Sequence, residues 1–313
     1  MAEEITQSQM PNDATNELDP QLVPQSDQLE STDTRPMARV DIDADTLPMP
    51  SSAVAEEPYI QVAQRCDVGL FRQRNEDSTF VFNAQSGGEI PVMPFSLCLV
   101  ADGMGGHHAG HEASRTVAHK VGHYVLERVY LPLVGGHAAS TRPMQDIMLE
   151  AADLANQAIH NPDPDKEGGT TLTAALIIGR RLFMTHIGDS RGYLLDGDDL
   201  KLLTTDHSVV QRLQEAGHIT AEQAAVHPHR NLLYRALTGN ELEVDTYTRA
   251  LPRQGMMLLC SDGLWGSIED DEIALVMKDE TISLHERCEK LVSMALTNGS
   301  TDNVTAVLIK FRL

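Results

Sequence analysis

The sequence lacks the features that typify membrane, secreted and nucleic-acid-binding proteins. None of its apolar runs approaches the ~18–20 residues of a membrane-spanning helix, so we expect no membrane insertion. Its first ten residues, MAEEITQSQM, have no basic start and no apolar stretch and do not predict a secretory signal. Basic residues are scarce, with 24 Lys and Arg against 46 Asp and Glu among 313 residues. The net charge of −22 argues against nucleic acid as a partner, because phosphate backbones bind basic surfaces.

The chain has only four cysteines, and they form no CxxC pair: Cys66, Cys98, Cys260 and Cys288. Thiols so far apart in sequence argue against a zinc knuckle and against a disulfide framework. A reducing compartment is the simplest setting for them, so the sequence predicts a cytoplasmic protein.

Residues 1–57 differ in composition from the rest of the chain. They contain 13 acidic and two basic residues, no aromatic residue, and much Pro, Gln, Ser and Thr. Such a segment buries too little apolar surface to offset the entropy cost of ordering its backbone. We expect a disordered acidic tail, either a solubilising leader or an interaction segment, followed by one folded domain over 58–313.

The folded part contains short apolar runs and longer helical patterns. Alternating or β-branched runs predict strands over 59–66, 78–83, 95–102, 171–179, 181–188, 191–196, 255–262 and 303–311. Apolar residues at helical spacing predict helices over 110–131, 143–160, 270–278 and 283–297. The short connections between the runs from 171 to 196 indicate antiparallel hairpins. This mixture predicts an α+β architecture with helices packed outside antiparallel sheets.

Acidic side chains stand at the tips of the predicted strands. Asp102, Asp189 and Asp262 follow apolar runs, whereas Glu76 and Asp302 stand just before one. Carboxylates that converge on one site repel each other, and a hard divalent cation such as Mg²⁺ or Mn²⁺ removes that repulsion. The alternative is that these acids are ordinary turn residues, since Asp-Gly is a common turn sequence.

Eight segments combine acidic, glycine and hydroxyl residues with apolar runs: DVGLFRQRNEDS (67–78), ADGMGGHHAGHEAS (101–114), GGTTLTAALI (168–177), HIGDSRGYLL (186–195), TTDHSVV (204–210), LLYRALTG (232–239), CSDGLWG (260–266) and TDNVTAVL (301–308). In this order they resemble the motifs of bacterial metal-dependent protein serine/threonine phosphatases, the PPM or protein phosphatase type 2C family. The resemblance runs from about Tyr59 to Leu313. It implies an αββα sandwich, in which two antiparallel sheets flanked by helices hold a metal centre at one edge.

The resemblance also implies hydrolysis of phosphoserine and phosphothreonine on proteins, with two Mn²⁺ or Mg²⁺ ions and a third, weaker ion in bacterial members. A water bridging two such ions has a lowered pKa and attacks phosphorus in line with the leaving oxygen. The implied ligands are Asp102 for both ions, Glu76 and the Gly103 carbonyl for one, Asp262 and Asp302 for the other, and Asp189 for the third.

Other residues take supporting roles in the same resemblance. Arg72 would clamp the substrate phosphate with its planar guanidinium. Asp77 would lie behind the ligands, and Ser190 and Arg191 would position Asp189 or tie two loops together. The segment 208–234 would be a mobile flap beside the active site.

The general acid departs from the pattern of animal members, in which a histidine follows the Asp-Gly pair directly. This sequence has Met104 at that position. His107 is our candidate for proton delivery to the leaving group, and a metal-bound water is the alternative. His107, His108 and His111 could also form a zinc site, against which the absence of an HExxH motif argues.

Two other functions fit parts of the sequence. Cys66 and Arg72 match the C-x5-R pattern of cysteine-dependent phosphatases, but Asp67 inside that loop would repel a phosphate dianion. A catalytically silent phosphoprotein-binding module is the other alternative, against which the complete ligand set argues. Phosphorylated proteins are the expected partners, together with the Hanks-type serine/threonine kinase that bacterial relatives usually oppose.

Overall fold

The computed structural model describes residues 57–86, 93–105, 109–136, 142–161 and 168–313. The predicted tail up to residue 56 and the candidate acid His107 lie outside the described residues. Within the described ranges, no helix combines the length and the apolarity needed to cross a lipid bilayer.

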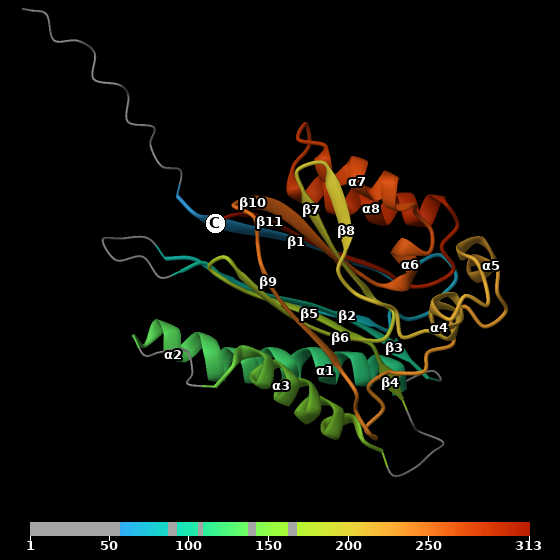
Figure 1. The fold of residues 1–313 in the computed structure, drawn as a ribbon, viewed down its shortest axis with the longest axis horizontal. Helices are drawn as coiled ribbons and strands as arrows, with labels where there is room; N and C mark the ends of the chain where they lie inside the picture. Colours follow the sequence, from blue (N-terminus) through green and yellow to red (C-terminus); the bar gives the residue numbers. More distant parts are fainter. Residues whose placement is uncertain (1–56, 87–92, 106–108, 137–141, 162–167) are drawn as a thin grey trace, which may run out of the picture. The chain divides into compact units, whose positions relative to one another are not determined.

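The strands form two antiparallel sheets (Figure 1). One has the order β1-β11-β10-β7-β8; the other has the order β2-β3-β5-β6-β9, with β4 paired to β3. The bounds are β1 Tyr59–Asp67, β2 Asp77–Ala84, β3 Phe95–Met104, β4 Gly169–Thr170, β5 Leu172–Ile178, β6 Arg181–Ile187, β7 Arg191–Asp196, β8 Asp199–Leu202, β9 Asp245–Ala250, β10 Gln254–Cys260 and β11 Val304–Arg312.

Helices cover the outer face of each sheet. The bounds are α1 Ala109–Val125, the π-helical turn η1 Leu126–Tyr130, α2 Leu131–Val134, α3 Met144–Ile159, α4 Val209–Glu215, α5 Ala221–Ala225, α6 Asp262–Trp265, α7 Asp270–Lys278 and α8 Leu284–Thr297. In Figure 1, α1 and α3 lie against the sheet that contains β3, and α7 and α8 lie against the sheet that contains β11. The predicted α+β fold, an αββα sandwich, is confirmed.

The space between the sheets is filled by apolar side chains from both. Val100 and Ala175 of one sheet join Leu259 and Val307 of the other in a single buried cluster. Because β3 lies between this cluster and the helices, its residues from Phe95 to Ala101 are all buried, as the continuous run FSLCLVA predicts. The polar end of β3 follows this buried run, and Asp102 is the first of its residues that is only partly buried.

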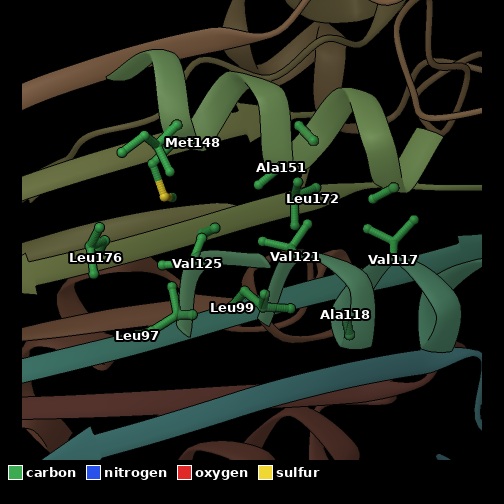
Figure 2. Packing of buried hydrophobic residues seen from close by; sticks show 14 of the residues in the cluster. Leu97, Leu99, Val117, Ala118, Val121, Val125, Met148, Ala151, Leu172 and Leu176 are labelled. Atoms are coloured by element: carbon green, nitrogen blue, oxygen red, sulfur yellow. The ribbon is translucent and has the colours of Figure 1, made fainter. Parts of the chain in front are cut away.

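Helical spacing directs α1 onto its sheet. Val117, Val121 and Val125 repeat every fourth residue, lie on one face of α1, and pack in one cluster with Leu97 and Leu99 of β3 (Figure 2). Fully burying a side chain of this kind stabilises the fold by about 1.5–3 kcal/mol. This packing holds the second half of α1 against the first half of β3.

One predicted pairing was wrong. The run 191–196 forms β7, but β7 pairs with β8 and β10 instead of with β6. The chain crosses from one sheet to the other at Gly188, whose φ of 106° is readily adopted only by glycine. A short connection therefore does not show that two strands share a sheet.

The segment 208–234, predicted to be a flap, carries α4 and α5. Ser208 caps α4 by accepting from the Gln211 N–H at 3.3 Å, and Thr220 forms a capping box with Gln223 at α5. Ser208 also forms an isolated bridge with Leu233. The segment is thus an excursion that is closed at its base.

Candidate active site

The ends of strands from both sheets bring five aspartates together. Asp77 begins β2 and lies directly opposite Asp102 of β3 in the strand register. Asp189 follows β6, Asp262 follows β10, and Asp302 precedes β11. Like charges directly opposite on neighbouring strands repel each other.

Burial and the charges of neighbouring carboxylates raise the pKa of Asp77, Asp102, Asp189 and Asp262. Burial, followed by the charges of Asp262 and Asp302, raises the pKa of Asp77 to about 7. Burial and the charge of Asp77 hold the pKa of Asp102 well above its usual range, and burial and the charge of Asp262 do the same for Asp189. Burial and the charge of Asp302 raise the pKa of Asp262 to about 6. The five side chains therefore share one neighbourhood.

Two oxygens of this cluster are buried without a partner in the part of the chain that the structure describes, namely Asp77 Oδ1 and Asp262 Oδ1. The other oxygen of Asp77 accepts a hydrogen bond from Ser261 Oγ at 2.8 Å. Burying a carboxylate oxygen without a hydrogen-bond partner destabilises the folded chain. Positive charge near these two atoms would remove that penalty.

The backbone at Asp102 and Gly103 is tightly enclosed. A Cβ atom on Gly103 would lie 2.3 Å from the Gly110 carbonyl oxygen and 2.7 Å from the Glu76 carbonyl oxygen. The Asp102 N–H donates to Thr171 Oγ1, and the Thr171 N–H donates to the Asp102 carbonyl, both at 2.9 Å. Because only glycine fits there, the chain can bring a carbonyl group close to a ligand.

Arg72 lies beside the acidic cluster. Its Nη2 donates to Asp302 Oδ2 at 2.6 Å, and its side chain is about half exposed. Although partial burial lowers its pKa, the hydrogen bond to Asp302 and the charges of Asp302, Glu76 and Asp102 raise it further, so the guanidinium stays charged. The predicted ligand Glu76 is therefore close to the same cluster.

Asn303 organises the loop that carries Arg72 and Glu76. Its Oδ1 accepts from the Glu76 N–H at 2.8 Å, and its Nδ2 donates to the carbonyls of Val68 at 2.8 Å and Arg74 at 3.0 Å. The side chain of Asn303 is buried. One amide thus pins both ends of the loop between β1 and β2 next to Asp302.

The donors fit a hard divalent cation, although they do not form a finished coordination sphere. Among the described residues, no group of three or more His, Cys, Asp or Glu side chains is arranged so that it could hold a metal ion. Asp302 is instead paired with Arg72. The fit rests on the chemistry of the donors, which are carboxylate and carbonyl oxygens with two buried carboxylate oxygens unpaired, because Mg²⁺ and Mn²⁺ prefer oxygen ligands.

The crossover loop with Asp189 is held by His207. The His207 N–H donates to the Gly188 carbonyl at 2.7 Å, and the Gly188 N–H donates to His207 Nδ1 at 3.1 Å. The far ring nitrogen, Nε2, lies 3.3 Å from Asp245 Oδ2. His207 therefore binds both the backbone N–H and the backbone carbonyl of Gly188, the residue before Asp189.

Arg191 ties the same loop to its neighbours. It donates three hydrogen bonds to Asp206, of 2.7 to 3.2 Å, and its guanidinium carbon lies 3.5 Å from the centre of the Trp265 ring. Trp265 Nε1 donates to the Asp189 carbonyl at 2.9 Å, and the hydroxyls of Ser190 and Thr171 are 2.8 Å apart. Arg191 therefore contacts Asp206 and Trp265, and Ser190 contacts Thr171, while the predicted positioning of Asp189 stays a prediction.

Sequence reasoning assigned no role to Asp206 and His207, although both lie in the segment TTDHSVV. Both side chains are buried. A buried polar side chain is usually hydrogen-bonded, and its partners indicate its structural role. The sequence offers only a weak signal for this, two polar residues shortly after a strand that was itself too short to predict.

Cys66 is poorly suited to act as a nucleophile. Its Sγ lies 2.9 Å from Thr305 Oγ1 and accepts from Asn75 Nδ2 at 3.0 Å. Burial and the charge of Asp77 raise the pKa of the Cys66 thiol to about 11, so it stays protonated at neutral pH.

The histidines after Asp102 divide between described and undescribed residues. His111 Nδ1 lies 3.0 Å from the Asn75 carbonyl oxygen. His107 and His108 lie outside the described residues, so the general acid and the zinc alternative stay predictions.

The sequence is similar to known protein phosphatases. A family model described as Protein phosphatase 2C matches residues 73–302. The chain is 39% identical over 250 residues to the serine/threonine protein phosphatase PstP of Mycobacterium tuberculosis (strain CDC 1551 / Oshkosh), covering 80% of this chain and 44% of PstP. It is 34% identical over 251 residues to the serine/threonine phosphatase stp of Listeria welshimeri, covering 80% of this chain and 95% of that protein. The chain thus spans less than half the length of PstP.

The fold is also similar to a solved structure, that of the catalytic domain of PstP in complex with two manganese ions. The TM-score is 0.66 at 35% identity, with 82% of this chain and 100% of that chain covered. These similarities agree with the fold and the resemblance predicted from the eight motifs.

Proposed function

The chain belongs to the protein phosphatase 2C family, and from this premise we propose that it hydrolyses phosphoserine and phosphothreonine on proteins with the help of divalent metal ions. The observation that carries the proposal is the cluster of five aspartates from two sheets. Burial and neighbouring charges raise the pKa of Asp102 and Asp262 within it, and two of its buried oxygens have no partner among the described residues. An acidic cluster of this kind favours cations, and bound divalent cations attract an anionic group such as a phosphate ester.

The proposed ligands are those that the family resemblance implies. Two Mn²⁺ or Mg²⁺ ions would be held by Asp102, Glu76, the Gly103 carbonyl, Asp262 and Asp302, and a third ion by Asp189. When bound, the ions would lower the pKa of a water molecule and neutralise charge on the phosphate oxygens. Asp302 has two carboxylate oxygens, and its hydrogen bond from Arg72 involves only Oδ2.

Arg72 is the proposed phosphate clamp. Its guanidinium now donates to a carboxylate, and a phosphate monoester offers the same geometry with two acceptor oxygens. In the reaction, a water oxygen bonds to phosphorus, the bond from phosphorus to the serine or threonine oxygen breaks, and that oxygen takes up a proton. His107 is the proposed donor of that proton.

The proposed substrates are phosphorylated proteins, together with the Hanks-type kinase that makes them. All four cysteines are free thiols, which supports a reducing cytoplasm as the place of action. The proposed catalytic domain is 58–313 with a flap at about 208–234. Deleting the acidic tail, 1–57, should therefore leave the melting temperature and the turnover of a small phosphate ester unchanged.

Metal removal and return test the activity. The full chain is treated with EDTA, and phosphate release from a phosphothreonine peptide is measured before and after Mn²⁺ or Mg²⁺ is added. We expect no turnover without metal, restored turnover with it, and no turnover in Asp102→Asn, whereas Asp271→Asn, at an exposed position of α7, should behave like wild type. Turnover that survives exhaustive chelation would contradict the proposal, and peptide binding without turnover would favour the silent binding module.

A further inference from the structure

Two large apolar side chains are exposed on the loop between β1 and β2, directly before Arg72. Leu70 is 70% exposed and Phe71 is 68% exposed. All six phenylalanines of the chain lie within the described residues, and the other five are buried or packed against a core cluster. Phe71 is thus the exception among them, and its neighbour Leu70 is exposed as well.

The backbone under these side chains is anchored. Gly69 has a φ of 78°, and a Cβ atom there would lie 2.3 Å from the Asp302 carbonyl oxygen. The Gly69 N–H donates to Asp67 Oδ1 at 3.0 Å, and Asn303 binds the carbonyls of Val68 and Arg74 on either side of the tip. Contacts on both sides of the tip thus anchor the loop that carries Leu70 and Phe71.

The position of Leu70 and Phe71 next to Arg72 indicates which ligand would cover them, namely a peptide whose phosphate binds Arg72. Consecutive Cα atoms are about 3.8 Å apart, so Phe71 and Leu70 lie within roughly 8 Å of the Arg72 backbone. An extended peptide advances by about 3.3 Å per residue, so a peptide whose phosphate binds Arg72 brings the residues on either side of the phosphosite to this tip. A substrate side chain that covers Leu70 and Phe71 removes water from them. This contact is most favourable when the substrate side chain is itself apolar.

We propose that Leu70 and Phe71 form an apolar docking surface for substrate side chains within about three residues of the phosphosite. The enzyme would thereby prefer phosphoproteins whose phosphothreonine or phosphoserine is flanked by residues such as Leu, Val or Phe. This inference rests on the proposed function, because Arg72 must hold the phosphate for the geometry to apply.

Two phosphothreonine peptides of equal length test the preference, one with Leu two residues before and after the phosphosite and one with Ser at both positions. With Mn²⁺, wild type should hydrolyse the Leu peptide with a kcat/KM about tenfold higher, since partly burying two large apolar side chains supports a factor of that size. In Leu70→Ser/Phe71→Ser the two peptides should differ by less than about twofold, through loss on the Leu peptide alone. Turnover of p-nitrophenyl phosphate, which has no flanking residues, should stay within about twofold.

Leu275→Ser is the matched control, because Leu275 is 72% exposed on α7, a helix on the outer face of the sheet that contains β11. It should leave the peptide preference unchanged. Equal loss on both peptides, or an unchanged preference in the double variant, would overturn the docking surface. If wild type hydrolyses neither peptide, the proposed function fails. The docking surface is then tested by itself through the affinity of the two labelled peptides for wild type and for the double variant, measured by fluorescence anisotropy.

Discussion

Neutralising Asp77 tests whether the acidic cluster stores repulsion in the fold. Asp77 is 6% exposed, its Oδ1 has no partner among the described residues, and its pKa is raised from 3.8 to about 7. That rise corresponds to about 4 kcal/mol of unfolding free energy lost at pH 8. Asp77→Asn keeps the shape and removes the charge, so it should recover about 2–4 kcal/mol in protein freed of metal, or roughly 5–15 °C in melting temperature.

The stabilisation expected for Asp77→Asn depends on pH. Because the pKa of Asp77 is higher in the folded than in the unfolded chain, the folded chain binds more protons between about pH 4 and pH 7. The unfolding free energy of wild type therefore falls as pH rises through this window. The advantage of Asp77→Asn should be full at pH 8 and should shrink toward zero near pH 4.

Thermal unfolding in EDTA at pH 5 and pH 8 measures both effects, and Asp206→Asn is the matched control. Asp206 is also a buried aspartate, at 5% exposure, but it accepts three hydrogen bonds from Arg191. Removing its charge should lower the unfolding free energy by about 3 kcal/mol, because the largely buried Arg191 guanidinium loses its carboxylate partner. If Asp77→Asn is destabilised at pH 8 as Asp206→Asn is, Asp77 is held by favourable partners and the repulsion inferred here does not exist.

Three further substitutions test neighbouring features. Arg72→Ala should raise KM for a phosphopeptide about 10- to 100-fold with a smaller change in kcat, since a hydrogen bond to a charged group contributes about 1.5–3 kcal/mol; an unchanged KM in steady-state kinetics would exclude Arg72 from phosphate binding. Cys66→Ser should keep metal-dependent turnover, because the thiol is protonated at neutral pH, and complete loss in a folded variant would restore the thiolate mechanism. Gly103→Ala should lower the unfolding free energy by more than about 3 kcal/mol, because its Cβ would meet the Gly110 carbonyl at 2.3 Å, whereas Gly136→Ala, with no atom within 4 Å, should cost only about 1–2 kcal/mol for its left-handed backbone; equal melting temperatures for the two variants would contradict the crowding at Gly103.

The sequence was most informative where burial alone decides the structure. Runs such as FSLCLVA and the valines of α1 predicted their elements because a continuous apolar run or a spacing of four residues has few other uses. β8 and β9 were missed because DLKL and DTYTRA, at the sheet edges, carry no such pattern. The partner of β7 was wrong because pairing depends on where the chain goes after Gly188, and local sequence does not record that.

The candidate site divides in the same way. Acids next to glycine, serine or asparagine at strand tips could be selected from the sequence, since a strand end is where a polar side chain can leave the core. The environments of these acids could not be predicted from the sequence. Asp77 and Asp206 are both buried aspartates after polar neighbours, yet Asp77 has no cationic partner within the described ranges and Asp206 binds Arg191. The difference arises from packing between segments, which no local pattern of residues specifies.

The origin of the acids links the chemistry to the fold. Asp77 and Asp102 belong to one sheet, whereas Asp262 and Asp302 flank strands of the other, so their repulsion acts across the interface between the two sheets. Cations bound among them would compensate charge from both sheets at once. Because a ligand that binds only the folded chain stabilises it by mass action, the ions proposed for catalysis would also hold this end of the sandwich closed. The carboxylates that destabilise the protein without metal would then be the ones through which metal stabilises it, so melting temperature should rise with Mn²⁺ in wild type and rise less in Asp77→Asn.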